Sequence, residues 1–157
     1  MNDTPSRTQR EDFLIIGYGN TLRSDDGAGP RVAEAIEVMH YPGVRTLACP
    51  VLTPELAEPV SQAHTALFVD AAVDAPHEVR LRALEPGESS QIMAHAADPR
   101  TILALARDVF GHTPIAWCLS IPAVKFDFGD EFSPEAQQGF TKALERIENL
   151  CRRPGMS

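Results

Sequence analysis

The stretch "IIGYGNTLRSDDGAGPRVAEAI", Ile15 to Ile36, decides the fold, because an apolar strand passes through a glycine-containing turn into a helical pattern. Such a turn opens many nucleotide-binding α/β units, but their fingerprint needs a third glycine where this chain has Leu22. It also needs an acid at the end of the second strand, which here ends at Cys49. The adjacent acids Asp25 and Asp26 oppose phosphate at the helix start. A nucleotide-binding oxidoreductase fragment is therefore the least supported interpretation.

Strand and helix patterns alternate along almost the whole chain. Apolar runs bounded by Gly, Pro or Asp predict strands at Phe13 to Gly17, Val44 to Cys49, Ala66 to Asp70, Val79 to Ala83 and Ile115 to Ile121. A capping side chain followed by Pro predicts helix starts at Thr53, Asp98 and Ser133, and Gly111 is a helix stop. The last helix has one apolar stripe, made of Ala136, Phe140, Ala143, Leu144, Ile147 and Leu150.

This alternation predicts an α/β fold: a single three-layer domain over residues 13–151, with a twisted, mostly parallel five-stranded sheet between helices. The hairpin-like spacing from Ala66 to Ala83 allows one antiparallel strand. Residues 1–12 and 152–157 are expected to be flexible termini.

Charge and composition exclude several classes of function. The 157 residues carry 22 acidic and 14 basic side chains, a net charge of -8, and no basic run, so neither nucleic acid nor an anionic membrane is an expected partner. The polar start is followed by only four apolar residues, too few for a signal peptide or a membrane span, and we expect a cytoplasmic protein. The three cysteines form no CxxC and are typical of free thiols.

Acidic side chains gather where the predicted strands end. In open parallel sheets, ligands bind beyond the carboxyl ends of the strands. That edge receives Asp25 and Asp26 after the first strand, Asp70 and Asp74 at the third, and His95 from a later loop. Acids with a histidine suggest a divalent metal ion. The alternative is structural, with an acid capping the following helix or turn and the histidine in solvent.

Several segments resemble the hydrogenase maturation endopeptidases. "GYGNTLRSDDGAGPRVAEAI" is similar to their opening, Gly-x-Gly-Asn-x-Leu-x-x-Asp-(Asp/Glu)-Gly-x-Gly. "LFVDAAV" resembles their strand ending in Asp, and "SSQIMAHAADPRTILALA" resembles their Ser-rich loop with a His before a helix. "SIPAVKFDFGDEFSPEAQQGF" resembles their last strand and the start of their final helix. The resemblance thus runs in order over residues 13–150.

The resemblance implies a function and a site. It implies a metal-dependent endopeptidase that removes the C-terminal extension from a nickel-loaded [NiFe] hydrogenase large-subunit precursor, its partner. By position, the metal ligands and catalytic residues are Asp26, Asp70 and His95. Nickel is the implied cofactor and is brought by the precursor. The nickel serves recognition, and the resemblance leaves open whether it also activates the scissile carbonyl or a water molecule. Asp25 and Asp74 are left as helpers or solvated carboxylates.

Two observations limit what the resemblance implies. Some relatives have Glu where this chain has Asp26, and "CPVLTPELAEPV" differs from the Gly-Thr loop of well-known members, which leaves the client hydrogenase open. The chain lacks the sequence signatures of serine, cysteine and HExxH proteases. A non-catalytic chaperone that checks the precursor for nickel would carry the same ligands and is the alternative function.

Overall fold

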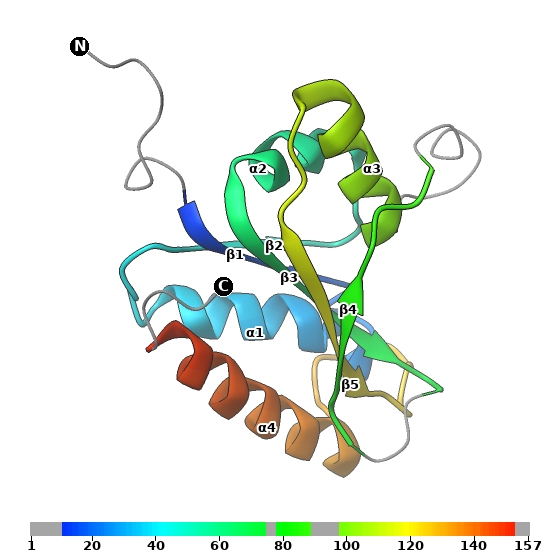
Figure 1. The fold of residues 1–157 in the computed structure, drawn as a ribbon. Helices are drawn as coiled ribbons and strands as arrows, with labels where there is room; N and C mark the ends of the chain where they lie inside the picture. The colour runs from blue at the N-terminus through cyan, green and yellow to red at the C-terminus, as the bar shows by residue number, and fades with distance from the viewer. Residues whose placement is uncertain (1–10, 75–77, 89–97, 153–157) are drawn as a thin grey trace.

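The sheet has five strands in the order β2-β1-β3-β5-β4, as Figure 1 shows. The computed structural model describes residues 11–74, 78–88 and 98–152. Neighbouring strands are parallel except β4 and β5, which are antiparallel. This confirms the predicted α/β class and the mostly parallel sheet. The strands are β1 (Glu11–Tyr18), β2 (Val44–Cys49), β3 (Ala63–Ala72), β4 (Arg80–Leu84) and β5 (Ile115–Pro122).

The antiparallel strand is β4, but it does not form a hairpin with β3. Strand β5 lies between them, pairing Asp70 of β3 with its Ser120 and Arg82 of β4 with its Cys118. The short connection from β3 to β4 suggests a hairpin, and no pattern in the sequence indicates that the later strand β5 lies between them.

The helices begin largely where the sequence predicted. They are η2 (Ser24–Gly27), α1 (Ala28–Glu37), η3 (Pro54–Leu56), α2 (Ala57–Ser61), α3 (Pro99–Phe110) and α4 (Pro134–Cys151). Asp98 accepts a hydrogen bond from the Thr101 amide, and Ser133 accepts one from the Ala136 amide, as N-caps do. At Thr53 the side chain makes no cap bond, and the segment starts as the 3-10 turn η3. Gly111 ends α3 in the left-handed conformation.

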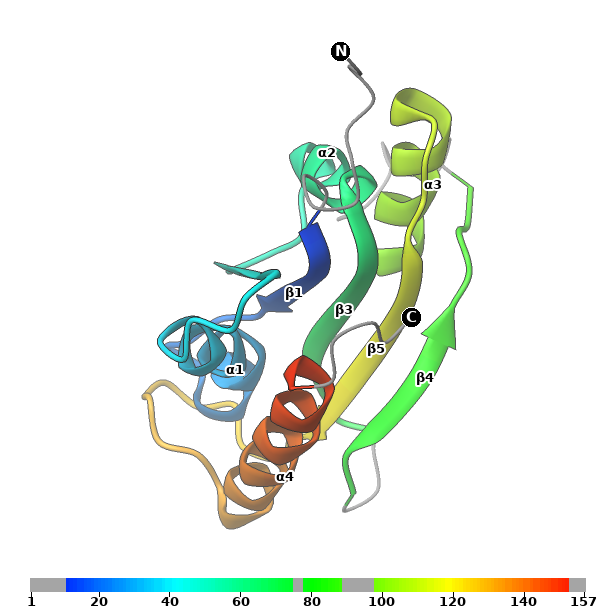
Figure 2. The same ribbon diagram turned by 60° about the vertical axis from the view of Figure 1, so that its left-hand side comes forward.

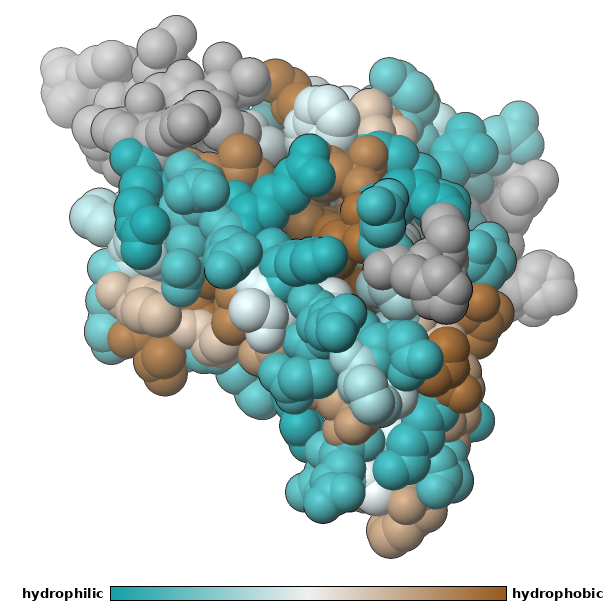
Figure 3. All heavy atoms as spheres, turned by 90° about the horizontal axis from the view of Figure 1, so that it is seen from below, coloured by the Kyte–Doolittle hydropathy of each residue, from teal (hydrophilic) through white to brown (hydrophobic). Residues whose placement is uncertain are grey.

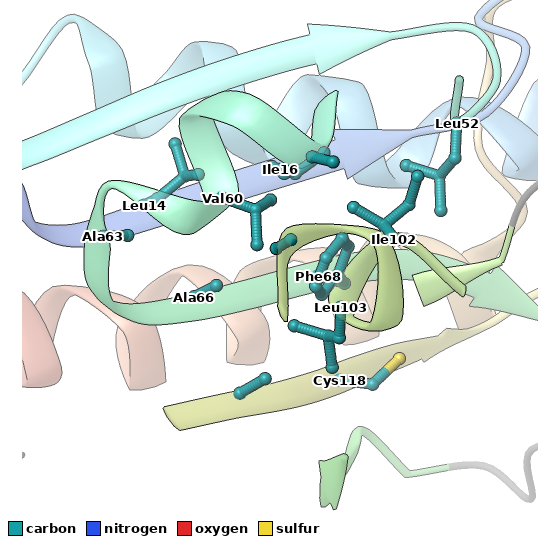
Figure 4. Close-up of a cluster of buried hydrophobic side chains, with 13 residues drawn as sticks. Leu14, Ile16, Leu52, Val60, Ala63, Ala66, Phe68, Ile102, Leu103 and Cys118 are labelled. Atoms are coloured by element: carbon teal, nitrogen blue, oxygen red, sulfur yellow. The ribbon is translucent and has the colours of Figure 1, made fainter. Parts of the chain in front are cut away.

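Two apolar clusters cover the two faces of the sheet. On one face Leu14, Ile16 and Phe68 pack against α2 and α3, as Figure 4 shows for side chains such as Val60 and Leu103. On the other face β-strand residues of the opposite parity pack against α1 and α4 (Figure 2); they are Ile15, Leu67, Val69, Leu119 and Ile121. Successive side chains of a strand alternate between faces, so each inner strand supplies both clusters and the predicted three layers result.

The face of the molecule seen from below is mainly hydrophilic, with hydrophobic side chains in separate patches (Figure 3). Among the described residues, no helix is both long and apolar enough to cross a membrane. The cysteines Cys49, Cys118 and Cys151 are all free thiols.

Candidate functional site

A cleft of about 560 Å³ opens on the α2/α3 face, near the carboxyl ends of the parallel strands. Its lining includes Tyr18 from the end of β1, Asp70 from β3 and Cys118 from β5. Arg82 of β4 and the first residues of α3 complete it. Tyr18, Asp70 and Cys118 share the strand parity of the cluster that packs under α2 and α3, which is why they face the same side.

Asp70 is the predicted ligand that lines this cleft. It was predicted at a strand end, whereas β3 continues to Ala72. The Tyr18 hydroxyl donates to Asp70 Oδ2 at 3.1 Å, and the Ser120 hydroxyl donates to Oδ1 at 2.9 Å. The Cys118 thiol also points at Oδ1, with 3.9 Å between the sulfur and oxygen atoms. Both carboxylate oxygens are therefore held by protein donors, which orient the group in the way that hydrogen-bond partners orient metal-binding carboxylates.

Burial sets the protonation of this group and its neighbours. Burial raises the pKa of Asp70 above its usual value, although the hydrogen bonds from Ser120 and Tyr18 and the charge of Arg82 partly oppose this. Burial, with the nearby Asp70, also raises the pKa of Tyr18 strongly, and that of the Cys118 thiol to about 11. At neutral pH Tyr18 and Cys118 therefore remain protonated and keep the hydrogens that they donate to Asp70.

Asp26 lies at the same edge of the sheet, on η2, which contacts β3. Its half-buried side chain folds back over the glycine turn, where Oδ2 accepts a hydrogen bond of 2.7 Å from the Asn20 amide. Asn20 Oδ1 in turn accepts from the Leu22 amide at 2.9 Å, as expected of a residue that fixes the turn. Gly19, at φ 144°, allows this approach, because a Cβ there would meet the Asp26 carbonyl.

Asp25, next to Asp26 in sequence, points into the protein and is fully buried, with 0% of its surface exposed. Oδ2 accepts from the Val124 and Lys125 amides, each at 2.8 Å, and from the Ser133 hydroxyl at 2.7 Å. Oδ1 accepts from the Ser133 amide at 2.8 Å. Burial alone would raise the pKa of Asp25, but these hydrogen bonds outweigh it and the pKa is lowered.

The structure thus corrects two readings of Asp25. It is not a solvated carboxylate, and neither Asp25 nor Asp26 caps a helix, because η2 and α1 begin without a side-chain cap bond. Its donors lie 99 to 108 residues further along the chain. No local pattern could have identified them.

Further bonds fasten the same turn to the segment between β5 and α4. The Ser24 amide donates to Gly129 O at 2.8 Å, and the Gly129 amide donates to Leu22 O at 2.8 Å. The Ser24 hydroxyl reaches Asp127 O, and the Arg23 guanidinium lies 5.7 Å from the centre of the Phe126 ring. The loop that carries Asp26 is therefore fixed both by hydrogen bonds within the turn and by contacts to the segment between β5 and α4.

Of the predicted ligands, Asp26 and Asp70 lie at one edge of the sheet, and His95 lies outside the described residues. Within the described ranges, no three His, Cys, Asp or Glu side chains are placed to hold a metal ion. The two acids have a donor chemistry that fits a divalent cation, each presenting a carboxylate fixed by neighbouring hydrogen-bond donors. Asp74 is exposed, which agrees with the solvated alternative.

No protein-family model matches the chain, and no curated protein matches it either. Solved structures do match. Hydrogenase maturating endopeptidase HybD from E. coli is 22% identical, with a TM-score of 0.71 over 92% of this chain and 94% of its own. [NiFe] hydrogenase maturation protease HybD from Thermococcus kodakarensis is 25% identical, with a TM-score of 0.66 over 90% and 99%. The maturation protease HycI from T. kodakarensis KOD1 is 18% identical, with a TM-score of 0.72 over 92% and 94%.

These matches extend over nearly the whole of each chain, so the protein has the three-layer α/β fold of the hydrogenase maturation endopeptidases. The resemblance that the sequence motifs indicated is confirmed at the level of the fold.

Proposed function

We propose that the protein is an endopeptidase that removes the C-terminal extension of a nickel-loaded [NiFe] hydrogenase large-subunit precursor in the cytoplasm. The observation that carries the proposal is Asp70, half-buried in the lining of a cleft and oriented by Tyr18 and Ser120, in a chain with the fold of the maturation proteases. Asp26 lies outside the lining of this cleft but at the same edge of the sheet, on η2, which contacts β3.

In this proposal, nickel would arrive with the precursor, and Asp26, Asp70 and His95 would hold it. A divalent ion there would supply Lewis acidity to the scissile carbonyl or to a water molecule. The protein's contribution is orientation. Tyr18 and Ser120 hold the Asp70 carboxylate in one rotamer, and the Asn20 amide holds that of Asp26. Such preorganisation keeps both acids in position before the substrate arrives.

The proposal is tested by mixing the purified protein with nickel-loaded and nickel-free precursor and measuring the mass of the large subunit. Mass loss that requires nickel supports the endopeptidase, whereas binding without mass loss supports the alternative, a chaperone that checks for nickel. Asp26→Asn, Asp70→Asn and His95→Ala should each abolish cleavage. Asp108→Asn, near the far end of α3, is the matched control and should cleave at the normal rate. Normal cleavage by one of the three variants would remove that residue from the site.

The same Asp70→Asn variant should fold at least as stably as the wild type at neutral pH. Because the folded-state pKa of Asp70 is raised, the folded state binds its proton more tightly than the unfolded chain does, and the wild type loses stability as pH rises through that pKa. The neutral amide escapes this loss. Thermal unfolding followed from pH 3 to pH 7.5 should therefore show the variant gaining on the wild type as the pH rises, and a large loss of stability in the variant would contradict this account.

A further inference from the structure

Strand β4 ends the sheet with one side open. It pairs with β5 on its inner side, and among the described residues no strand lies beyond it, as Figures 1 and 2 show from two directions. An edge strand presents N–H and C=O groups that another extended chain can pair with. Proteins use such edges to bind peptides by adding a strand to the sheet.

The open strand borders the candidate active site directly. Arg82, Ala83 and Leu84 of β4 line the same cleft as Asp70. Arg82 lies opposite Cys118 in the ladder, and its charge acts on the Asp70 carboxyl. The other edge strand, β2, contributes no residue to this cleft. A chain paired with β4 would therefore run along the cleft, and one paired with β2 would not.

The side chains of β4 leave its edge accessible. Arg80, Arg82 and Ala83 are exposed, and Ala83 is too small to shield the backbone. Leu81 and Leu84 are half-buried against the two apolar clusters and hold the strand in place. Charged residues also protect edge strands from aggregation, which would explain Arg80 and Arg82 without a ligand. Protection alone does not explain why the strand with this open edge also forms a wall of the cleft.

We propose that the free edge of β4 binds the substrate as an added strand: the extended segment of the precursor next to the cleavage point pairs its backbone with β4 and so enters the cleft beside Asp70. This inference rests on the proposed function, because it takes the precursor as the substrate. Recognition through the backbone makes the enzyme tolerant of side chains in this segment, and fixes the depth at which the chain enters.

Hydrogen exchange tests the inference. In the free protein, the outward-facing amides of residues 80–84 should exchange quickly and the alternate ones, bonded to β5, slowly. When Asp70→Asn protein is saturated with nickel-loaded precursor, the fast amides should slow by about tenfold or more. The outer amides of β2 are the internal control and should not change. If the fast amides of β4 stay unprotected in a complex shown by native mass spectrometry to be fully formed, the inference is overturned.

A substitution gives an independent test. The amides of Arg82 and Ala83 point to opposite sides of β4, and hydrogen exchange identifies the one that points outward. Replacing that residue by Pro removes an outward donor and leaves the hydrogen bonds to β5 intact. It should keep the thermal unfolding midpoint and slow cleavage roughly three- to tenfold, as expected for one lost backbone hydrogen bond. Gly at the same position removes the same side chain but keeps the amide, so it should cleave roughly three- to tenfold faster than the proline variant. Normal cleavage by the proline variant would count against the added strand.

The two hypotheses fail differently. Nickel-dependent mass loss without protection of the β4 amides would support the endopeptidase function and contradict binding of the precursor as an added strand. Protection of β4 without mass loss from the wild-type protein would do the reverse.

Discussion

Asp25 and Asp26 are adjacent in sequence and have opposite environments. Asp25 is buried and accepts four hydrogen bonds from the segment before α4, while Asp26 is half-buried and accepts one from the glycine turn. Neither acid suits a phosphate-binding site, because a carboxylate repels phosphate. The pair makes sense because one carboxylate fixes the loop and the other is left at the edge of the sheet, where a cation can approach.

Replacing Asp25 by Asn should destabilise the fold. The Asn side chain has only one acceptor oxygen, and its NH₂ group would face the backbone donors. We therefore expect the free energy of unfolding to fall by about 2–3 kcal/mol at pH 7. Because the pKa of Asp25 is lowered in the folded state, its stabilisation is present above the unfolded-state pKa and is lost as pH falls through the folded-state pKa. Urea unfolding at pH 7 and pH 3 should show the difference between wild type and variant shrinking in acid.

Asp74→Asn is the matched control for this change, since Asp74 is exposed. Its effect should stay within about 0.5 kcal/mol. A loss from Asp25→Asn no larger than the control's would mean that the four hydrogen bonds contribute nothing net.

At the scale of elements, the glycine turn serves helix packing. Gly29 lies within α1 and touches the strands below it: a Cβ there would collide with the Val69 carbonyl and lie 2.7 Å from that of Tyr18. Close packing of a helix on strands is the role of the third glycine in nucleotide-binding turns. Here Gly29 fills that role, although the fingerprint position itself holds Leu22.

Gly29→Ala should therefore be costly. The obstructing atoms belong to backbone of β1 and β3 and cannot turn aside, so α1 must shift, at a cost of about 1–3 kcal/mol or more. Gly87→Ala is the control, because a Cβ there meets the Arg100 side chain at 3.4 Å, an ordinary contact. Chemical denaturation of the two variants measures the difference, and equal stabilities would contradict the close approach.

Local signals predicted the elements well and their partners poorly. Strand β2 runs over Val44–Cys49 as predicted, and the caps Asp98 and Ser133 form, because these features depend on neighbours in sequence. The predicted strand Ala66 to Asp70 is longer at both ends, and β4 is shifted by one residue. Pairing of β4 with β5 depends on tertiary packing, which propensity does not contain.

The site divides in the same way. Asp26 and Asp70 could be placed at one edge from the order of strands, whereas Tyr18, Ser120 and Cys118 were missed as partners of Asp70. Their only signal is register: Ser120 pairs with Asp70 across β3 and β5, and register becomes visible only once the sheet is known. The ligand role of His95 and the nickel stay predictions.

At the scale of the molecule, two apolar clusters on opposite faces share one sheet, so they should unfold together. Phe68 belongs to the cluster under α2 and α3, and Ile147 of α4 to the other. Both side chains are fully buried.

Phe68→Leu and Ile147→Val should each lower the free energy of unfolding by about 1 kcal/mol. Because the two residues lie on opposite faces, the double variant should show the sum within about 0.5 kcal/mol. Denaturation followed by circular dichroism and by Trp117 fluorescence should give one coincident transition for all variants. Separate transitions would mean that the faces unfold as independent units.

The strand order β3-β5-β4 also sets the order in which the chain can assemble on the ribosome. Strands β1, β2 and β3 emerge first and can pair at once, but β4 leaves the ribosome before the β5 strand with which it pairs. The hydrogen bonds to Asp25 form later still, because its donors Val124 and Ser133 follow β5 in the chain. The turn over residues 17–29 is therefore completed only after β5 has emerged, and a nascent chain cut short before Val124 would leave the Asp25 carboxylate without its four donors.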